Sequence, residues 1–158
     1  MFHSSKSVGI LGAILLCGAW GLAQSGTPVT NSYDAAITNQ VTINQCSMGE
    51  PVALDGVLHV SYSVTTDSSG VNQFTVTAAN AVTGSGQKTG IAYAASDSAD
   101  YNSNTTDSSA DMTVELKSDL NPQGSGPGLT LVQSLHIVVD TSGNISAEVV
   151  SNTTGCGS

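Results

Sequence analysis

Arginine is missing from this sequence altogether, and lysine occurs only three times against twelve acidic residues. Nucleic acids and anionic membrane surfaces bind proteins through cations that displace or neutralise counterions. We therefore exclude nucleic acid as a partner, and also electrostatic attachment to a membrane. Charged residues of both signs make up only 9% of the chain, so the solubility of the folded protein rests on Ser, Thr, Asn and Gly.

Aromatic residues are also scarce, at 4% of the chain. Glu50, Glu115 and Glu148 could supply the two carboxylates of a glycosidase, but sugar sites usually also have aromatic platforms. The Gly-x-Ser-x-Gly motif that exposes a serine nucleophile does not occur either. These absences favour a non-enzymatic protein, and we expect no cofactor.

The N-terminus has the three parts of a secretory signal peptide. Lys6 precedes an apolar run, Val8 to Leu22, and small residues then lead to Ala23. We predict a signal peptide over residues 1–23, cleaved after Ala23. A membrane anchor is the alternative, but the run is short for a span of about 20 residues and no basic cluster follows it. A lipid-modified Cys17 is disfavoured because large apolar residues precede it. The expected location is extracellular or periplasmic, with no membrane span in the mature chain.

Cleavage of the signal changes the cysteine count. Of three cysteines, Cys17 is removed, and Cys46 and Cys156 remain in a compartment that permits disulfides. We predict that these two are joined, which could contribute about 4–5 kcal/mol on the chain-entropy account. Two free thiols are the alternative. A zinc site is disfavoured because two Cys alone cannot fill four positions.

Alternation of apolar and polar residues with a period of two dominates the sequence, and this period is typical of half-buried β-strands. In Asp111–Lys117, for example, Met112, Val114 and Leu116 share one face. Leu129–Val139 has additional apolar residues on its second face, so we expect it to be the most central strand. The other predicted strands are Ile37–Ile43, Val57–Thr65, Phe74–Ala78, Thr89–Ala94 and Ile145–Val149.

Short turn signals separate these segments. Turns are predicted at Asp67–Gly70, Thr83–Gly86 and Asp140–Asn144, and longer polar linkers at Ser96–Ser109 and Ser118–Gly128. No amphipathic helix is predicted from Ile37 onward, so parallel crossovers have no connecting helix.

The predicted fold class is therefore all-β. We expect an antiparallel meander of about seven strands, forming a β-sandwich or a small β-barrel. Residues 24–36 are small and polar, and we expect a flexible mature N-terminus there. Residues 37–158 are predicted to form a single all-β domain.

Two motifs remain to be considered. The first is Cys-x-x-Gly-Glu-x-Val, at Cys46 to Val52. The second is a Gly-x-Gly-Pro-Gly turn, at Gly124 to Gly128, followed by His136 in a late strand and a closing Cys156. Together these motifs resemble those of short secreted bacterial proteins of unassigned function. The resemblance implies a bacterial, exported protein with a terminal Cys pair. It implies no catalytic residues.

Three candidate functions remain open. We favour an exported, non-enzymatic binding or structural β-domain with an extracellular or cell-surface partner. The first alternative is an extracellular hydrolase that uses His59 or His136, which could meet if their strands are neighbours. The second is a β-barrel that carries a small apolar ligand. A calcium site is a further, weak expectation, because oxygen ligands cluster in one acidic tract: Asp97, Asp100, Asp107 and Asp111.

Overall fold

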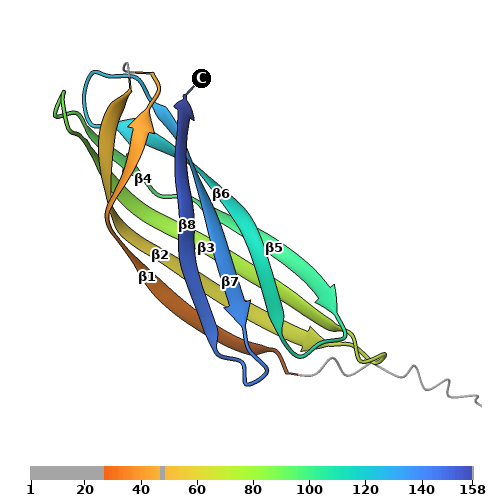
Figure 1. Cartoon of the computed structure of the whole chain (residues 1–158). Helices are drawn as coiled ribbons and strands as arrows, with labels where there is room; N and C mark the ends of the chain where they lie inside the picture. The colour runs from red at the N-terminus through yellow and green to blue at the C-terminus, as the bar shows by residue number, and fades with distance from the viewer. Residues whose placement is uncertain (1–26, 47–48, 158) are drawn as a thin grey trace, which may run out of the picture.

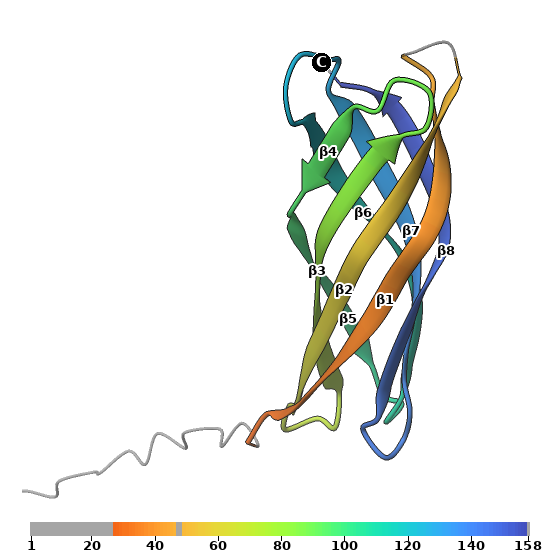
Figure 2. The same cartoon turned by 90° about the vertical axis from the view of Figure 1, so that its left-hand side faces the viewer.

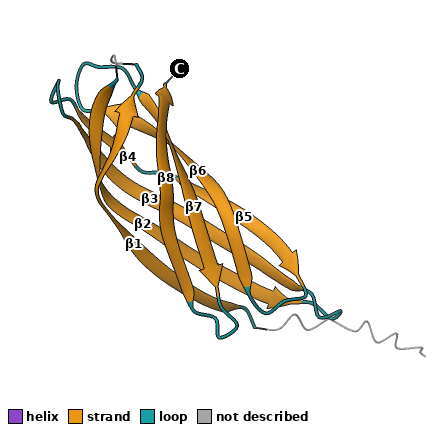
Figure 3. Ribbon diagram, in the orientation of Figure 1, coloured by secondary structure: helices purple, strands orange, loops and turns teal. Residues whose placement is uncertain are grey.

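The computed structural model describes residues 27–46 and 49–157, and this part of the chain forms β-strands without any helix (Figure 1, Figure 3). Every strand pair is antiparallel. The predicted all-β class and the antiparallel meander are confirmed. The strands are β1 (Val29–Asn44), β2 (Glu50–Thr66), β3 (Asn72–Gly86), β4 (Ala92–Ala95), β5 (Ser98–Thr105), β6 (Ala110–Pro122), β7 (Leu129–Val139) and β8 (Ile145–Cys156).

The sheet curves around a common axis and is nearly closed, like a barrel (Figure 2). Its strand order is β1-β2-β3-β4-β6-β7-β8, and β5 pairs with β3 beside β4. β4 and β5 pair with different halves of β3, one after the other, and together they occupy a single strand position in the sheet. The eight strands therefore fill seven positions. β4 connects the two halves of the sheet through only two residue pairs, Tyr93 with Pro122 and Ala94 with Asn121.

Side chains rather than a backbone ladder hold the seam between the first and last strands. Within the described residues, β1 pairs only with β2 and β8 only with β7. Across the seam, Asn152 Nδ2 donates to Gln40 Oε1 at 2.5 Å and Thr154 Oγ1 donates to the Ile43 carbonyl at 2.5 Å. β1 and β8 therefore lie side by side but keep separate backbone ladders.

A second seam separates β5 from β6. The Tyr101 hydroxyl on β5 donates to the Glu115 carbonyl on β6 at 2.8 Å. The Asp97 carboxylate likewise accepts the backbone N–H of Asp119 at 3.2 Å. These side-chain bonds satisfy edge groups of β6 that a neighbouring strand would otherwise pair.

The two ends of the barrel differ, and we name them the clasp end and the open end. A disulfide between Cys46 and Cys156, with Cα atoms 5.4 Å apart, lies at the clasp end, where β1 and β8 finish (Figure 1). This confirms the predicted pairing. At the open end, Asp67 Oδ1 accepts the backbone N–H groups two and four residues later, at 2.8 and 3.0 Å. Asp140 Oδ1 does the same at 2.8 and 2.9 Å, so both predicted Asp-led turns form.

Buried and exposed side chains alternate along the strands, and the buried ones from both halves of the sheet pack into one hydrophobic core. β7 shows it most plainly, because each buried residue is followed by a half-buried one. The residues of its second face are half-buried, but the expectation that this is the most central strand is wrong, because β7 is last but one in the strand order, next to β8. The inward apolar residues of β7 are Leu129, Leu131, Leu135, Ile137 and Val139.

A polar network crosses the interior between the two halves. Asn80 Nδ2 on β3 donates to Gln133 Oε1 on β7 at 2.6 Å and to Ser118 Oγ on β6 at 2.8 Å. Gln133 Nε2 donates in turn to Asn152 Oδ1 on β8 at 3.0 Å. Asn80, Ser118 and Gln133 are all buried, so these bonds satisfy groups that water cannot reach.

Four further sequence predictions need correction. The linker predicted at Ser118–Gly128 begins within β6, which continues as far as Pro122. The interval 24–36, expected to be flexible, is strand from Val29 onward, because its backbone pairs with β2. The linker predicted at Ser96–Ser109 contains β5, which pairs with β3. The turn predicted at Thr83–Gly86 is the end of β3. The predicted signal peptide, residues 1–23, lies outside the described residues.

Candidate functional site

Short hydroxyl side chains lie in register on the outer face of the barrel, over β1, β2 and β3 near the open end. Ser32 on β1 lies opposite Ser61 on β2, which lies opposite Thr77 on β3. The adjacent row, formed by Thr30, Ser63 and Thr75, also consists of hydroxyl side chains. We call these six residues the hydroxyl face: Thr30, Ser32, Ser61, Ser63, Thr75 and Thr77. Figure 2 shows the three strands side by side at the front of the molecule.

A groove of about 550 Å³ lies over the hydroxyl face. On its β3 side, Thr75 Oγ1 donates to Asn102 Oδ1 at 2.9 Å and Thr77 Oγ1 donates to Asp100 Oδ1 at 2.6 Å. Within the described residues, the hydroxyls of the other four members have no intramolecular hydrogen bond. The groove is therefore lined by polar groups that remain available for hydrogen bonding.

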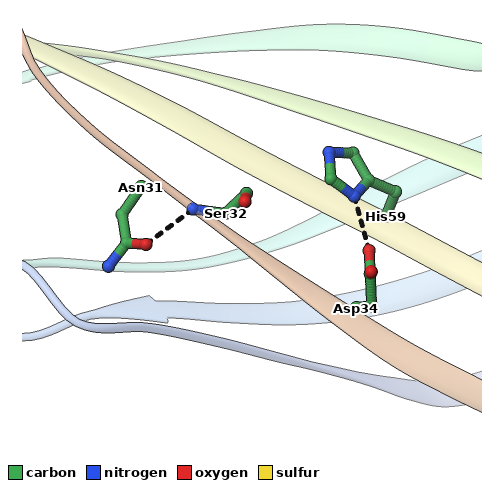
Figure 4. A network of polar contacts seen from close by, with 4 residues as sticks. All are labelled: Asn31, Ser32, Asp34 and His59. Carbon is green, nitrogen blue, oxygen red and sulfur yellow. Dashed lines mark hydrogen bonds and ion pairs between the residues drawn. The ribbon is translucent and has the colours of Figure 1, made fainter.

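His59 on β2 and Asp34 on β1 form the next outward-facing pair beyond the hydroxyl face, two residues along each strand from Ser61 and Ser32 (Figure 4). His59 Nδ1 is 2.5 Å from Asp34 Oδ1, and the two side chains are 51% and 67% exposed. Nearby, Asn31 Oδ1 accepts the backbone N–H of Ser32 at 2.8 Å. Both side chains are largely solvated, so the contribution of this contact to stability is small.

His136 lies between two carboxylates on the outer face of β6, β7 and β8. Its Nε2 is 2.9 Å from Asp111 Oδ1 and its Nδ1 is 3.5 Å from Glu148 Oε1. The hydrogen bond to Asp111 is the main cause that raises the pKa of His136 above its ordinary value. Both ring nitrogens therefore face carboxylate oxygens, an arrangement that favours the imidazolium.

The two histidines do not meet. His59 is on β2 and His136 is on β7, strands that are not neighbours in the sheet. Each faces outward between buried residues of its own strand. A Ser-His-acid arrangement needs a hydroxyl within reach of the imidazole. Within the described residues, neither imidazole is hydrogen-bonded to a hydroxyl, and Asp140 instead caps its own turn.

The four calcium candidates have separate roles. Asp97 accepts a backbone N–H of β6, Asp100 accepts the Thr77 hydroxyl, and Asp111 contacts His136. Asp107 lies in the turn between β5 and β6, where its carbonyl accepts a side-chain bond from β3. Across residues 27–46 and 49–157, no group of three or more His, Cys, Asp or Glu side chains is placed to hold a metal ion.

Glu50, from the Cys-x-x-Gly-Glu motif, is a buried carboxylate at the clasp end. Its Oε1 accepts the backbone N–H groups of Lys88 and Thr89 at 2.9 and 2.6 Å. These bonds, with that from Thr89 the largest, lower the pKa of Glu50. Glu50 thus ties the turn between β3 and β4 to the start of β2. Its Oε2 is buried without a partner in the described part of the chain.

Sequence reasoning missed the interior network and the role of Glu50. The signal for the network was present, because Gln133 interrupts an otherwise apolar face of β7. A polar residue in an apolar register is either an error in the predicted strand or a buried group with partners. For Glu50 no local signal existed, since the backbone groups that it binds lie 38 and 39 residues away.

Comparisons with protein families, with curated proteins and with solved structures find no match. Among the described residues, no helix has the length and apolar character needed to cross a membrane.

Proposed function

We propose that this chain is an exported, non-enzymatic β-domain that acts as a binding or structural module outside the cytoplasm. The single observation that carries the proposal is the disulfide between Cys46 and Cys156, with Cα atoms 5.4 Å apart. Disulfides persist in oxidising compartments and are rare in the cytoplasm. The bond joins the ends of the first and last strands, so the folded structure contains these two cysteines in their oxidised form.

Features of the sequence support the same proposal. The apolar run from Val8 to Leu22 and the small residues up to Ala23 favour export through a cleaved signal. The terminal Cys pair, together with the Gly-Glu and Gly-Pro-Gly motifs, resembles that of secreted bacterial proteins. A surface poor in charge but rich in hydroxyl groups suits an extracellular or cell-surface partner.

The geometry favours a binding role over the two alternatives. A hydrolase at His59 or His136 would need a hydroxyl hydrogen-bonded to the imidazole, and neither ring has one within residues 27–46 and 49–157. A carrier of an apolar ligand needs interior space, whereas here both halves of the sheet contribute to one core. The bond between Asn80 and Gln133 crosses that core at 2.6 Å.

Expression of the full chain in a bacterium tests the proposal. We expect the protein in the periplasmic or medium fraction, without residues 1–23 and without free thiol under denaturing, non-reducing conditions. A matched variant with Leu15→Asp in the apolar run should remain in the cytoplasm with reduced cysteines. Retention of the unaltered chain in the cytoplasm, or turnover of ester, peptide or glycoside substrates that His136→Ala abolishes, would overturn the proposal.

A further inference from the structure

The hydroxyl face contains an ordered two-by-two array of hydroxyls that have no hydrogen-bond partner among the described residues. Thr30 lies opposite Ser63, and Ser32 lies opposite Ser61. Opposite residues in an antiparallel pair have Cβ atoms about 4.5–5.5 Å apart, and residues two apart along a strand are separated by about 7 Å. Each hydroxyl can donate one hydrogen bond and accept others. The array therefore suits a ligand whose own groups both donate and accept at short intervals.

Neighbouring strands hold the adjacent polar groups in fixed orientations. The Thr75 and Thr77 hydroxyls donate to Asn102 and Asp100 on β5, so their lone pairs remain free to accept from a ligand. Ser and Thr also have short side chains, which lose little rotamer freedom when they bind. The groove thus presents polar groups that are already oriented by the sheet before any ligand arrives.

The chemistry of the groove limits what it can bind. The chain has a net charge of −9 and no cationic side chain on the hydroxyl face, so an anion would be repelled. Tyr62 lines the groove but is 3% exposed and donates its hydroxyl to the Gly143 carbonyl at 2.7 Å, so an apolar ligand finds little to contact. A neutral, polyhydroxylated ligand fits the remaining chemistry.

The outer face of the other half of the sheet provides a contrast. On β6 the outward-facing positions are mostly charged, whereas the outward-facing positions of the hydroxyl face on β2 and β3 are Ser and Thr. The charged residues on β6 are Asp111, Glu115, Lys117 and Asp119. Both faces are solvated, but the groove over the hydroxyl face has an uncharged lining, whereas the groove beside His136 is lined in part by Glu148. Solvation alone therefore does not explain the difference in chemistry between the two faces.

We propose that the groove over the hydroxyl face binds a neutral glycan chain. This inference rests on the proposed function and names the class of ligand for it. Recognition proceeds through hydrogen bonds rather than aromatic stacking, which agrees with the 4% content of aromatic residues. Each bond exchanges with water and contributes little by itself. A polymer that engages both rows at once should therefore bind much better than a single sugar.

Affinity electrophoresis in native gels provides the test, because an acidic protein migrates well and a neutral polymer in the gel does not. The exported, disulfide-bonded chain is run in gels that contain dextran, laminarin or xylan, with polygalacturonate as the anionic comparison. We expect at least one neutral polymer to retard the protein, and free glucose to compete only at much higher concentration. Polygalacturonate should have no effect.

A double substitution on β2, Ser61→Ala with Ser63→Ala, should weaken the retardation at least tenfold. The matched control, Thr130→Val with Ser134→Ala on the outer face of β7, should stay within twofold of the unaltered chain. Unchanged melting temperatures would show that both variants fold. On adding a soluble oligosaccharide of the retarding polymer, amide NMR shifts should change at residues 30–32 and 61–63.

Two results would overturn the inference: no retardation by any neutral polymer, or equal retardation of the unaltered chain and the Ser61→Ala/Ser63→Ala variant. Retardation by polygalacturonate alone would also overturn it, because an anionic ligand contradicts the uncharged lining. These failures differ from failure of the proposed function, since export and disulfide formation are measured separately from glycan binding.

Discussion

Asn80 on β3 and Gln133 on β7 join the two halves of the sheet through a 2.6 Å hydrogen bond in the interior of the barrel. Both residues are almost fully buried, with 3% and 0% of their surface exposed. Gln133 also donates to Asn152, so a single side chain connects β3, through the core, to the seam strand β8. A buried network of this kind stabilises the fold only when each of its members has partners.

Gln133→Leu should therefore destabilise the protein although it makes the core more apolar. The change leaves Asn152 Oδ1 and one N–H of Asn80 without their present partner, and each unsatisfied buried group costs about 1–3 kcal/mol. Urea unfolding at pH 7 measures the loss. Gln73→Leu on the exposed face of β3 is the control and should change stability by less than about 0.5 kcal/mol. Equal stability of the Gln133→Leu variant and the unaltered chain would contradict the importance of the network.

Removal of the disulfide should loosen the clasp end first. The double variant Cys46→Ser/Cys156→Ser is expected to lose about 2–5 kcal/mol. Because no ladder joins β1 to β8 in the described structure, amide exchange near residues 42–44 and 152–156 should accelerate more than exchange in β7. Treatment of the unaltered chain with a reductant should reproduce both effects. Uniform acceleration over all strands would show that the bond does not act locally.

Acid should weaken the clasp end through Glu50. Its pKa is lowered below the ordinary 4.5, chiefly by the hydrogen bond from the Thr89 N–H, so the unfolded chain binds the proton more readily than the folded chain. The stability that this carboxylate contributes is present above pH 4.5 and is lost as the pH falls below that value.

Urea midpoints measured between pH 7 and pH 3 test this expectation. Glu50→Gln should have a lower urea midpoint at pH 7, and its midpoint should decline less steeply in acid than that of the unaltered chain. Glu115→Gln, a change on the exposed face of β6, is the control for the loss of one negative charge. A decline in acid that is just as steep in Glu50→Gln would assign the effect to other groups.

His136 should titrate above its ordinary value of 6.5, because the hydrogen bond to Asp111 favours the imidazolium. A raised pKa in the folded state means that its contribution to stability is complete below pH 6.5. That contribution is lost as the pH rises through the raised value. NMR titration of the imidazole ring should therefore give a midpoint above 6.5, and Asp111→Asn should lower it. Asp107→Asn, in the turn before β6, should leave it unchanged, and an equal shift in both variants would refute the specific contact.

The sequence predicted the strands whose two faces differ strongly in polarity. Asp111 to Lys117 alternates strictly, and the structure places this segment inside β6 with Leu116 buried. The Asp-led turns were also predictable, because an Asp side chain binds its own backbone locally. The disulfide followed from the count of cysteines that remain once the predicted signal peptide is set aside. Strands and turns of this kind can be predicted from a few neighbouring residues, and the disulfide from the number of cysteines alone.

Strands that depend on distant partners were not predictable in the same way. β5 consists of small polar residues with little apolar alternation, and it exists because its backbone pairs with β3. The end of β3 resembled a turn because of Gly84 and Gly86. A Cβ at Gly86 would lie 2.7 Å from Glu50 Oε1, so glycine there reflects close packing within a strand. The hydroxyl face could not be predicted either, because its residues come together only through the registers of β1, β2 and β3.

The position of the disulfide also determines how the molecule would respond to a pulling force. A load applied between residue 27 at the open end and residue 157 at the clasp end passes along β1 to Cys46 and then directly through the sulfur atoms to Cys156. Strands β2 to β8 lie outside this path. β1 can peel away from β2, but residues 27–46 span at most roughly 70 Å when fully extended, at about 3.5 Å per residue. Because β1 is already an extended strand, little length is gained before the load rests on covalent bonds. Oxidation therefore gives the chain a short, fixed limit of extension while most of the barrel carries no tension.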